Sequence, residues 1–304
     1  MAENLMLEEQ RFKAMGCSCR VVTRGSDGAA LEGVRLVREY EARWSRFISS
    51  SEICGINALA GQVVVTSPET FNLIALAEAA RSWTKGRFNP LMLSQLEASG
   101  YSRRWSEGVS DGYAGGATPG TNLAIDLFAS ANAVVLPKGH RFDPGGIGKG
   151  FAADLVCAEL VRLGATTVMV DLGGDLRVAG DPWYGDQWRV ELAAPQQRRD
   201  SAGCLTLAED GAVATSSVLS RRWRSGGQAV HHLLDPLTGL SCETDLLTVS
   251  VCAPTTWQAE VAAKVGLLAG SVGVAAELRR LGVHGVAFTR DGSPISTRRS
   301  AMVS

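Results

Sequence analysis

The sequence predicts a globular protein that contains both helices and strands, and three observations lead to this prediction. The chain has 304 residues, of which 45% are hydrophobic and 20% are charged, as in one large or two ordinary globular domains. Apolar residues recur at helical spacing in the first half of the chain. Several short strand-like segments occur between residues 187 and 253 in the second half.

Composition and charge argue against several classes of protein. The 30 Lys and Arg residues nearly balance the 31 Asp and Glu residues, and no basic stripe is present, so we do not expect a nucleic acid partner. No run of about 18 apolar residues occurs, so we expect no membrane insertion. Residues 1–15 mix charge into every short window, unlike a signal peptide, and this predicts a cytoplasmic location.

The cysteines fit the same location. Their odd number, their apolar surroundings and the lack of zinc-site spacing predict buried thiols in a reducing compartment. The seven positions are Cys17, Cys19, Cys54, Cys157, Cys204, Cys242 and Cys252.

The first half of the chain predicts one strand, over residues 19–23, and two helices. The second helix begins after Ser67 as N-cap, with Pro68 at its first position, and Gly86 stands where a C-terminal cap belongs. The first helix begins near Ser26, and its apolar residues should face the core, namely Leu31, Val34, Val37, Tyr40, Trp44 and Phe47.

Residues 107–121 follow, and they are rich in glycine and nearly free of apolar side chains. We expect a long loop or flap there, inside a single domain spanning residues 1–304. A glycine turn and a helix around 145–163 and a strand over 167–171 should follow, before the strands of 187–253.

The C-terminal part of the sequence predicts two helices and a hairpin. Thr255 and Gln258 have the spacing of a capping box, which would begin a helix running to Gly270. A shorter helix follows, and Asp291-Gly292 is a typical turn for the terminal hairpin.

The segment FDPGGIGKGFAAD, residues 142–154, is the strongest candidate for a binding site. Gly145, Gly146 and Gly148 would let the backbone approach a ligand, while Lys149 and a helix N-terminus would attract phosphate. The segment is not a P-loop, because Gly150 stands where Ser or Thr is required. A tight turn without a ligand is the alternative.

Two further segments carry polar groups at strand ends. In VDLGGDLRVAG, Asp171 and Asp175 flank two glycines, which could equally form an ordinary hairpin. His231 and His232 should point to opposite faces of a strand, so one of them faces inward, near Asp235. A hydroxyl cluster, Thr215 to Ser217, precedes them.

Read in order, these segments resemble the ApbE family, the FAD:protein FMN transferases. The resemblance implies an α+β fold of mixed, largely antiparallel sheets with flanking helices, related to the T-fold. The matching segments are MGC (15–17), SRFISSSEICGIN (45–57), GRFNP (86–90), DPGGIGKGFAAD (143–154), DLGGD (171–175), ATSS (214–217), HLLDPLTG (232–239) and AEVAAKVGLLAG (259–270).

The resemblance also implies a reaction. FAD, usually with Mg²⁺, would be cleaved at its pyrophosphate, and FMN would pass to a Thr or Ser hydroxyl of an acceptor flavoprotein while AMP leaves. His232, with Asp235, matches the family position of a base or phosphate contact. The positions that would bind FAD are Met15, Asn57, Gly145, Gly146, Lys149, Asp154, Asp171, Gly173, Thr215, Ser216 and His232.

The family metal positions fall on the carbonyl of Gly148 and on Glu260 and Lys264, where relatives carry Asp and Thr. Lys264 could therefore replace the metal, with Glu260 holding its ammonium. Because this helix is apolar on all sides, the two charges should be buried and paired. Two functions stay open: an active FMN transferase, or an FAD-binding carrier, sensor or slow FAD pyrophosphatase.

Overall fold

The computed structural model describes residues 6–109, 123–193, 201–207 and 209–297. The chain divides into two compact units. The first comprises residues 1–41, 149–216 and 245–304, and the second comprises 42–148 and 217–244. The expectation of one domain over the whole chain stays a prediction. No helix within the described ranges is long and apolar enough to cross a bilayer.

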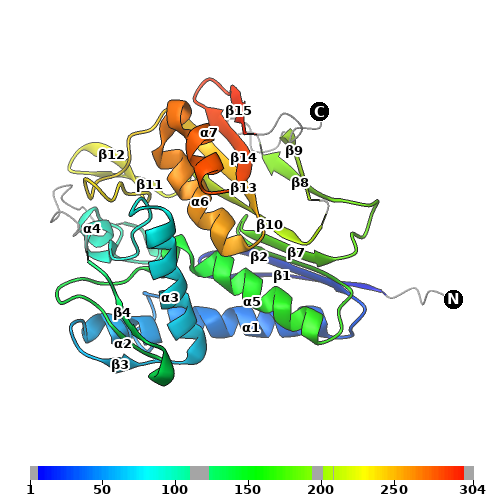
Figure 1. The fold of residues 1–304 in the computed structure, drawn as a ribbon, viewed down its shortest axis with the longest axis horizontal. Helices are drawn as coiled ribbons and strands as arrows, with labels where there is room; N and C mark the ends of the chain where they lie inside the picture. Colours follow the sequence, from blue (N-terminus) through cyan, green and yellow to red (C-terminus); the bar gives the residue numbers. More distant parts are fainter. Residues whose placement is uncertain (1–5, 110–122, 194–200, 208, 298–304) are drawn as a thin grey trace. The chain divides into compact units, whose positions relative to one another are not determined.

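An eight-stranded sheet, in the order β1-β2-β6-β7-β10-β13-β14-β15, forms the centre of the first unit (Figure 1). Every strand pair whose register is known in this sheet is antiparallel. The strands are β1 (Leu7–Ala14), β2 (Cys17–Arg24), β6 (Thr167–Leu172), β7 (Leu176–Gly180), β10 (Gly211–Ser217), β13 (Leu246–Ala253), β14 (His284–Thr289) and β15 (Pro294–Ser296).

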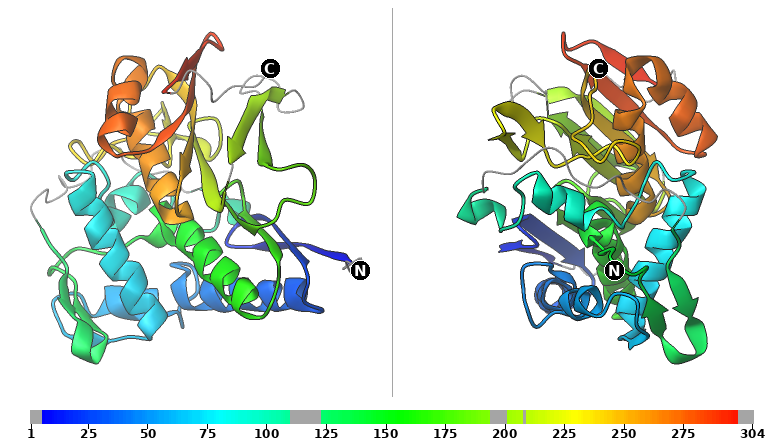
Figure 2. Two further views of the ribbon diagram at one scale, coloured as in Figure 1. Left: turned by 45° about the vertical axis from the view of Figure 1, so that its right-hand side comes forward. Right: turned by 90° about the vertical axis from the view of Figure 1, so that its left-hand side faces the viewer.

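Helices cover one face of this sheet, and a two-stranded ribbon covers the other (Figure 2). The ribbon consists of β8 (Trp188–Ala193) and β9 (Ser201–Leu207), and Trp188 and Leu205 pack with Val22 of β2 in one apolar cluster. On the helical face, Gly33 lies against Val21. The helices are α1 (Ala29–Trp44), α5 (Gly148–Arg162), α6 (Thr256–Leu268) and α7 (Gly270–Arg280).

The second unit has its own small sheet, in the order β3-β5-β4, and a ribbon of two strands. Trp223 and Val230 of the ribbon pack with Leu96 and Tyr101. The elements are α2 (Glu52–Ala58), β3 (Val64–Val65), α3 (Pro68–Trp83), α4 (Leu93–Ala98), η1 (Trp105–Glu107), β4 (Asp126–Phe128), η2 (Ala129–Ala131), β5 (Ala133–Val135), η3 (Pro144–Gly146), β11 (Arg222–Ser225) and β12 (Gln228–His231).

The expected helices and strands are present, with differences at α1 and at the cap of α6, which is described below. Leu31 is 63% exposed, although the other expected core residues inside α1 are buried. Phe47 lies beyond the end of α1. Most of the expected flap, residues 110–121, lies outside the described residues.

The start of α3 is as the sequence predicts. Ser67 is the N-cap and its hydroxyl accepts a hydrogen bond from the Thr70 N–H, while Pro68 occupies the first turn. After the helix, Gly86 has a φ of +80° and donates its N–H to the Arg81 carbonyl. Both ends are therefore set by residues next to the helix.

Candidate active site

Two hairpin turns lie side by side at one end of the large sheet. Met15 and Gly16 connect β1 to β2 with φ values of +51° and +69°, and Gly173 and Gly174 connect β6 to β7 with φ values of +74° and +95°. Two positive φ values are typical of type I′ turns. A Cβ at Gly173 would lie 2.7 Å from the Cβ of Cys17, so only glycine fits between the turns.

The glycine-rich segment forms a 3₁₀ turn, Pro144–Gly146, followed by α5. Gly145, Gly146 and Gly148 are not among the residues with positive φ. A close approach between two backbone segments occurs at Gly150, where a Cβ would lie 2.8 Å from the Thr256 carbonyl. This glycine therefore lets the first turn of α5 lie against the first turn of α6.

Lys149, expected to meet phosphate, lies within a network of charged side chains. Its ammonium forms ion pairs with Asp175 and, at 3.2 Å, with Glu260. Glu260 also accepts hydrogen bonds from the Gly150 N–H at 2.8 Å and the Lys264 ammonium at 3.0 Å. The two carboxylates are almost fully buried, and the two lysine side chains are 20% and 17% exposed. The expected pairing of Glu260 with Lys264 is present in this network.

Burial and neighbouring charges act on Glu260 in opposite directions. Burial alone would raise the pKa of this carboxyl, but the positive charges of Lys149 and Lys264 and the Gly150 N–H outweigh burial. The pKa falls to about 2, so Glu260 is ionised at neutral pH. With Asp175, the network contains two positive and two negative side chains.

Asp154, expected to line the FAD site, caps α6. Its carboxylate accepts hydrogen bonds from the Thr256 N–H at 2.8 Å, the Thr256 hydroxyl at 2.8 Å and the Trp257 N–H at 3.1 Å. The expected capping box is wrong: Thr255 precedes the helix but makes no cap hydrogen bond, and its hydroxyl donates to the Gln258 side chain instead. Desolvation by burial raises the pKa of Asp154, against the lowering effect of these bonds.

Three further expected residues lie near the turn between β6 and β7. Asp171 accepts from the Gly174 N–H at 2.7 Å, and burial raises the pKa of its carboxyl. Thr215 hydrogen-bonds to Ser250 at 2.8 Å and shares a sheet face with Val213, which packs in the ribbon-side cluster. Ser216 is buried and, by alternation along the strand, points to the other face.

The two adjacent histidines differ in how their rings are held. His231 ends β12, and its Nε2 lies 3.1 Å from the Cys242 carbonyl, while its Nδ1 accepts from the Leu233 N–H. These contacts fix a neutral tautomer with the proton on Nε2. His232 follows the strand and is half-buried. The structural role thus falls to His231, and His232 is the candidate for chemistry.

Asp235 and Asn57 organise the backbone around them. Asp235 accepts from the Leu237 N–H at 2.9 Å, and its own carbonyl accepts from the Thr238 and Gly239 N–H groups in a tight turn. The Asn57 side chain accepts from the Phe142 N–H at 2.7 Å and donates to the Phe142 carbonyl at 2.9 Å. This pair of bonds fixes the residue just before the DPGG turn.

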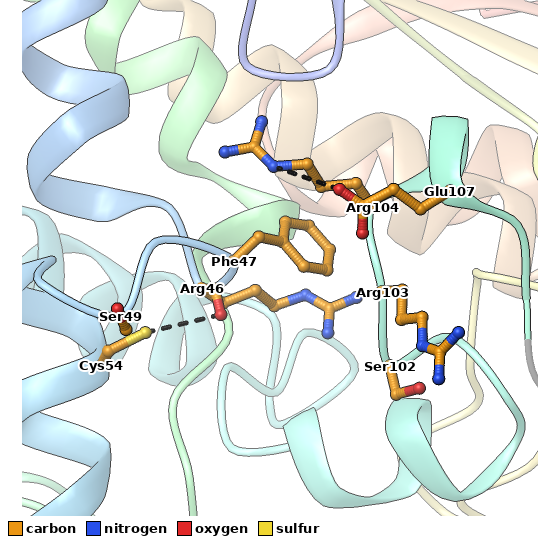
Figure 3. A pocket seen from close by; sticks show the side chains of 8 residues that line it. All are labelled: Arg46, Phe47, Ser49, Cys54, Ser102, Arg103, Arg104 and Glu107. Carbon is orange, nitrogen blue, oxygen red and sulfur yellow. Dashed lines mark hydrogen bonds and ion pairs between the residues drawn. The ribbon is translucent and has the colours of Figure 1, made fainter.

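Sequence reasoning missed a cavity of about 400 Å³ in the second unit (Figure 3). The Arg46 guanidinium stacks 4.2 Å from the centre of the Phe47 ring. The signal in the sequence was the grouping of arginines beside aromatic residues at 46–47 and 103–105. The lining residues are Arg46, Phe47, Ser49, Cys54, Ser102, Arg103, Arg104 and Glu107.

The residues at the positions that the resemblance assigns to a metal do not fit Mg²⁺. A magnesium ion needs oxygen ligands at about 2.0–2.1 Å, but an ammonium lies 3.0 Å from Glu260 Oε1. Both Glu260 oxygens already accept hydrogen bonds. Among the described residues, no group of three or more His, Cys, Asp or Glu side chains could hold a metal.

Comparisons with known proteins agree with the segment pattern. The sequence model of the ApbE family matches residues 15–286. The FAD:protein FMN transferase of Treponema pallidum is 27% identical over 272 residues, which cover 80% of this chain and 72% of that protein. The enzyme of the same name from Salmonella typhimurium is 28% identical over 137 residues, covering 42% of this chain and 39% of that protein.

A solved structure supports the fold. The crystal structure of the ApbE protein of Thermotoga maritima superimposes with a TM-score of 0.85 at 24% sequence identity, covering 96% of this chain and 97% of that one. The expected α+β fold with largely antiparallel sheets is therefore confirmed.

Proposed function

This chain belongs to the ApbE family, and we propose that it is an FAD:protein FMN transferase. The observation that carries the proposal is the family match over residues 15–286, which includes every candidate site residue identified above. The enzyme would move FMN from FAD to a Thr or Ser hydroxyl of an acceptor flavoprotein. AMP would be the second product.

The reaction is a phosphoryl-type transfer, which depends mainly on positioning and charge neutralisation. The acceptor hydroxyl oxygen bonds to the phosphorus of the FMN half as the bond from that phosphorus to the bridging oxygen breaks. The bridging oxygen leaves with AMP, and the hydroxyl proton goes to a base. Since the His231 ring is held in a neutral structural role, we assign the base to His232.

Several residues of α5 and α6 hold the side chains of the proposed site in fixed positions. Asp154 fixes the start of α6, and Gly150 allows α5 to approach it. The Lys149–Asp175–Glu260–Lys264 network fixes the side chains between the two helices. This fixed arrangement matters because the protein forms no covalent bond with FMN in the proposed reaction and acts by holding charged groups in position.

We also propose that the protein acts in the cytoplasm. All seven cysteines are thiols rather than disulfides, which is typical of proteins in a reducing environment. We therefore expect the acceptor flavoprotein to be cytoplasmic.

The test is incubation with FAD, Mg²⁺ and an acceptor domain known to carry phosphoester-linked FMN. Intact-protein mass spectrometry should detect one added FMN on the acceptor, and chromatography should detect an equal amount of AMP. If AMP and unattached FMN appear without the adduct, the protein is an FAD pyrophosphatase. If neither product forms although FAD binds, it is a flavin-binding protein without transfer.

The assignment of His232 predicts that His232→Ala lowers the transfer rate by at least about a hundredfold, the usual contribution of a general base, while FAD still binds. His140→Ala is the matched control, because His140 is partly exposed and its ring lies 3.2 Å from the carbonyl of the nearby Lys138. Equal loss in both variants, or full activity of His232→Ala, would refute the assignment.

A further inference from the structure

Glu260 lies between two ammonium groups, and Lys264 is the one other charged residue of its helix. Ala259, Val261, Ala262 and Ala263 around it are fully buried. An unpaired charge in such a place costs several kcal/mol, so removal of one charged side chain of the network should destabilise the others. The two lysines and two carboxylates balance one another, which leaves no net negative charge to attract a divalent cation.

The two lysines are not equivalent. Lys149 forms ion pairs with both Asp175 and Glu260. Lys264 pairs with Glu260 at 3.0 Å, and this is its one ion pair among the residues that the structure describes. An ammonium has three N–H donors, and the Lys264 side chain is 17% exposed. Lys264 is therefore the cation of the network that can still donate to a ligand.

We propose that the Lys264 ammonium is a built-in cation that takes the place of a divalent metal in this site. Glu260 fixes the ammonium, and Lys149 keeps Glu260 ionised. The expected ligand is the diphosphate of FAD, and this identity rests on the proposed function. Two consequences follow: the site does not bind a divalent cation, and FAD binds equally well with and without Mg²⁺.

The first arm of the test uses the metal alone, so it does not depend on FAD. Mn²⁺, as a spectroscopic substitute for Mg²⁺, is titrated into the wild-type protein and followed by electron paramagnetic resonance. We expect no Mn²⁺ site that depends on residue 260. The double variant Glu260→Asp with Lys264→Thr removes the ammonium and supplies oxygen ligands, so it should gain such a site.

The second arm measures FAD affinity by flavin fluorescence in EDTA and in MgCl₂. The wild-type dissociation constant should be unchanged between the two conditions. The single variant Lys264→Met should weaken FAD binding in EDTA by about tenfold or more, which corresponds to about 1.4 kcal/mol. Lys138→Thr, which removes an exposed lysine, should leave the dissociation constant unchanged.

Circular dichroism on each variant separates loss of binding from loss of folding. If Lys264→Met does not fold, the double variant Glu260→Gln with Lys264→Met, which removes both charges of the pair, is used in the same assay in place of the single variant. A wild-type Mn²⁺ site that disappears in Glu260→Gln would overturn the proposal and leave the transferase function standing. Wild-type FAD binding that requires Mg²⁺ would also overturn it. Absence of FMN transfer, with Mn²⁺ still rejected, would count against the proposed function alone.

Discussion

Helices α3 and α6 begin in two different ways. At α3, the N-cap Ser67 accepts the Thr70 N–H, three residues further along the chain. At α6, Thr255 makes no cap bond, and the N–H groups of Thr256 and Trp257 donate to Asp154, which belongs to α5. A local cap stabilises its own helix, whereas a cap from another helix also fixes where the two helices meet.

The contacts further along α6 also join it to α5. Glu260 accepts from the Gly150 N–H and the Lys149 ammonium, so the first two turns of α6 bind the first two turns of α5 in both directions. Asp154 on α5 accepts hydrogen bonds from the start of α6, and Glu260 on α6 accepts one from the start of α5. The start of α6 is in this way capped by a residue of another helix, while α3 is capped by its own N-cap Ser67, whose N–H donates to Glu52 of α2.

The largest expected effect concerns Glu260 in acid. An unfolded Glu titrates near about 4.3, and the Lys149 and Lys264 ammonium groups hold the pKa of Glu260 well below that value in the fold, so the ionised carboxylate stabilises the protein at neutral pH. Because the folded pKa is lowered, this contribution is present above about pH 4.3 and disappears as the pH falls towards 2.

Urea unfolding of the wild-type protein and Glu260→Gln, followed by circular dichroism at several pH values, measures this contribution. The variant should be less stable by about 3 kcal/mol at neutral pH, and the difference should shrink through the acid range. A difference that does not depend on pH would show that Glu260 acts through packing and not through its charge.

The sequence predicted what depends on neighbouring residues. Ser67, Pro68 and Gly86 lie beside the helix they delimit, and the Asp291-Gly292 turn joins adjacent strands, so their spacing was informative. The pairing of Glu260 with Lys264 was predictable because four residues separate them on one helix.

Long-range contacts were not predictable in this way. The bonds of Asp154 to Thr256 and of Lys149 to Asp175 join residues far apart in the sequence. Lys149 beside three glycines predicts a phosphate site, and this stays a prediction. Nothing nearby in the sequence could reveal that two buried carboxylates, Asp175 and Glu260, pair with it. The cavity beside Arg46 could not be predicted for the same reason, because its lining combines residues 46–54 with residues 102–107.

The next largest effect concerns the cap of α6. Asp154→Ala leaves the Thr256 and Trp257 N–H groups without their acceptor and should destabilise the protein by about 2 kcal/mol. Asp154→Asn keeps one acceptor oxygen. Because burial raises the pKa of Asp154, ionisation of this carboxyl is less favourable in the fold than in the unfolded chain. The Asn variant avoids this cost but loses one of the two acceptor oxygens that receive three hydrogen bonds, so it should lie between the wild type and Ala.

The measurement is urea unfolding at neutral pH, with FAD affinity determined for the same variants. We expect the order of stability to be wild type, then Asn, then Ala, and we expect FAD binding to weaken along that order because α6 carries Lys264. Unchanged FAD affinity in a destabilised Ala variant would separate the cap from the binding site and weaken the comparison drawn above.

The smallest effect is expected at α3, where the cap is local. Ser67→Ala removes the acceptor of the Thr70 N–H and should cost about 1 kcal/mol in urea unfolding, with Ser67→Asp recovering most of it. Ser50→Ala is the matched control, because Ser50 is exposed. Since the bond stays within the first turn of α3, FAD affinity should not change in Ser67→Ala. A loss of affinity as large as that of Asp154→Ala would mean that the start of α3 also positions the site, and the distinction between the two helices would fail.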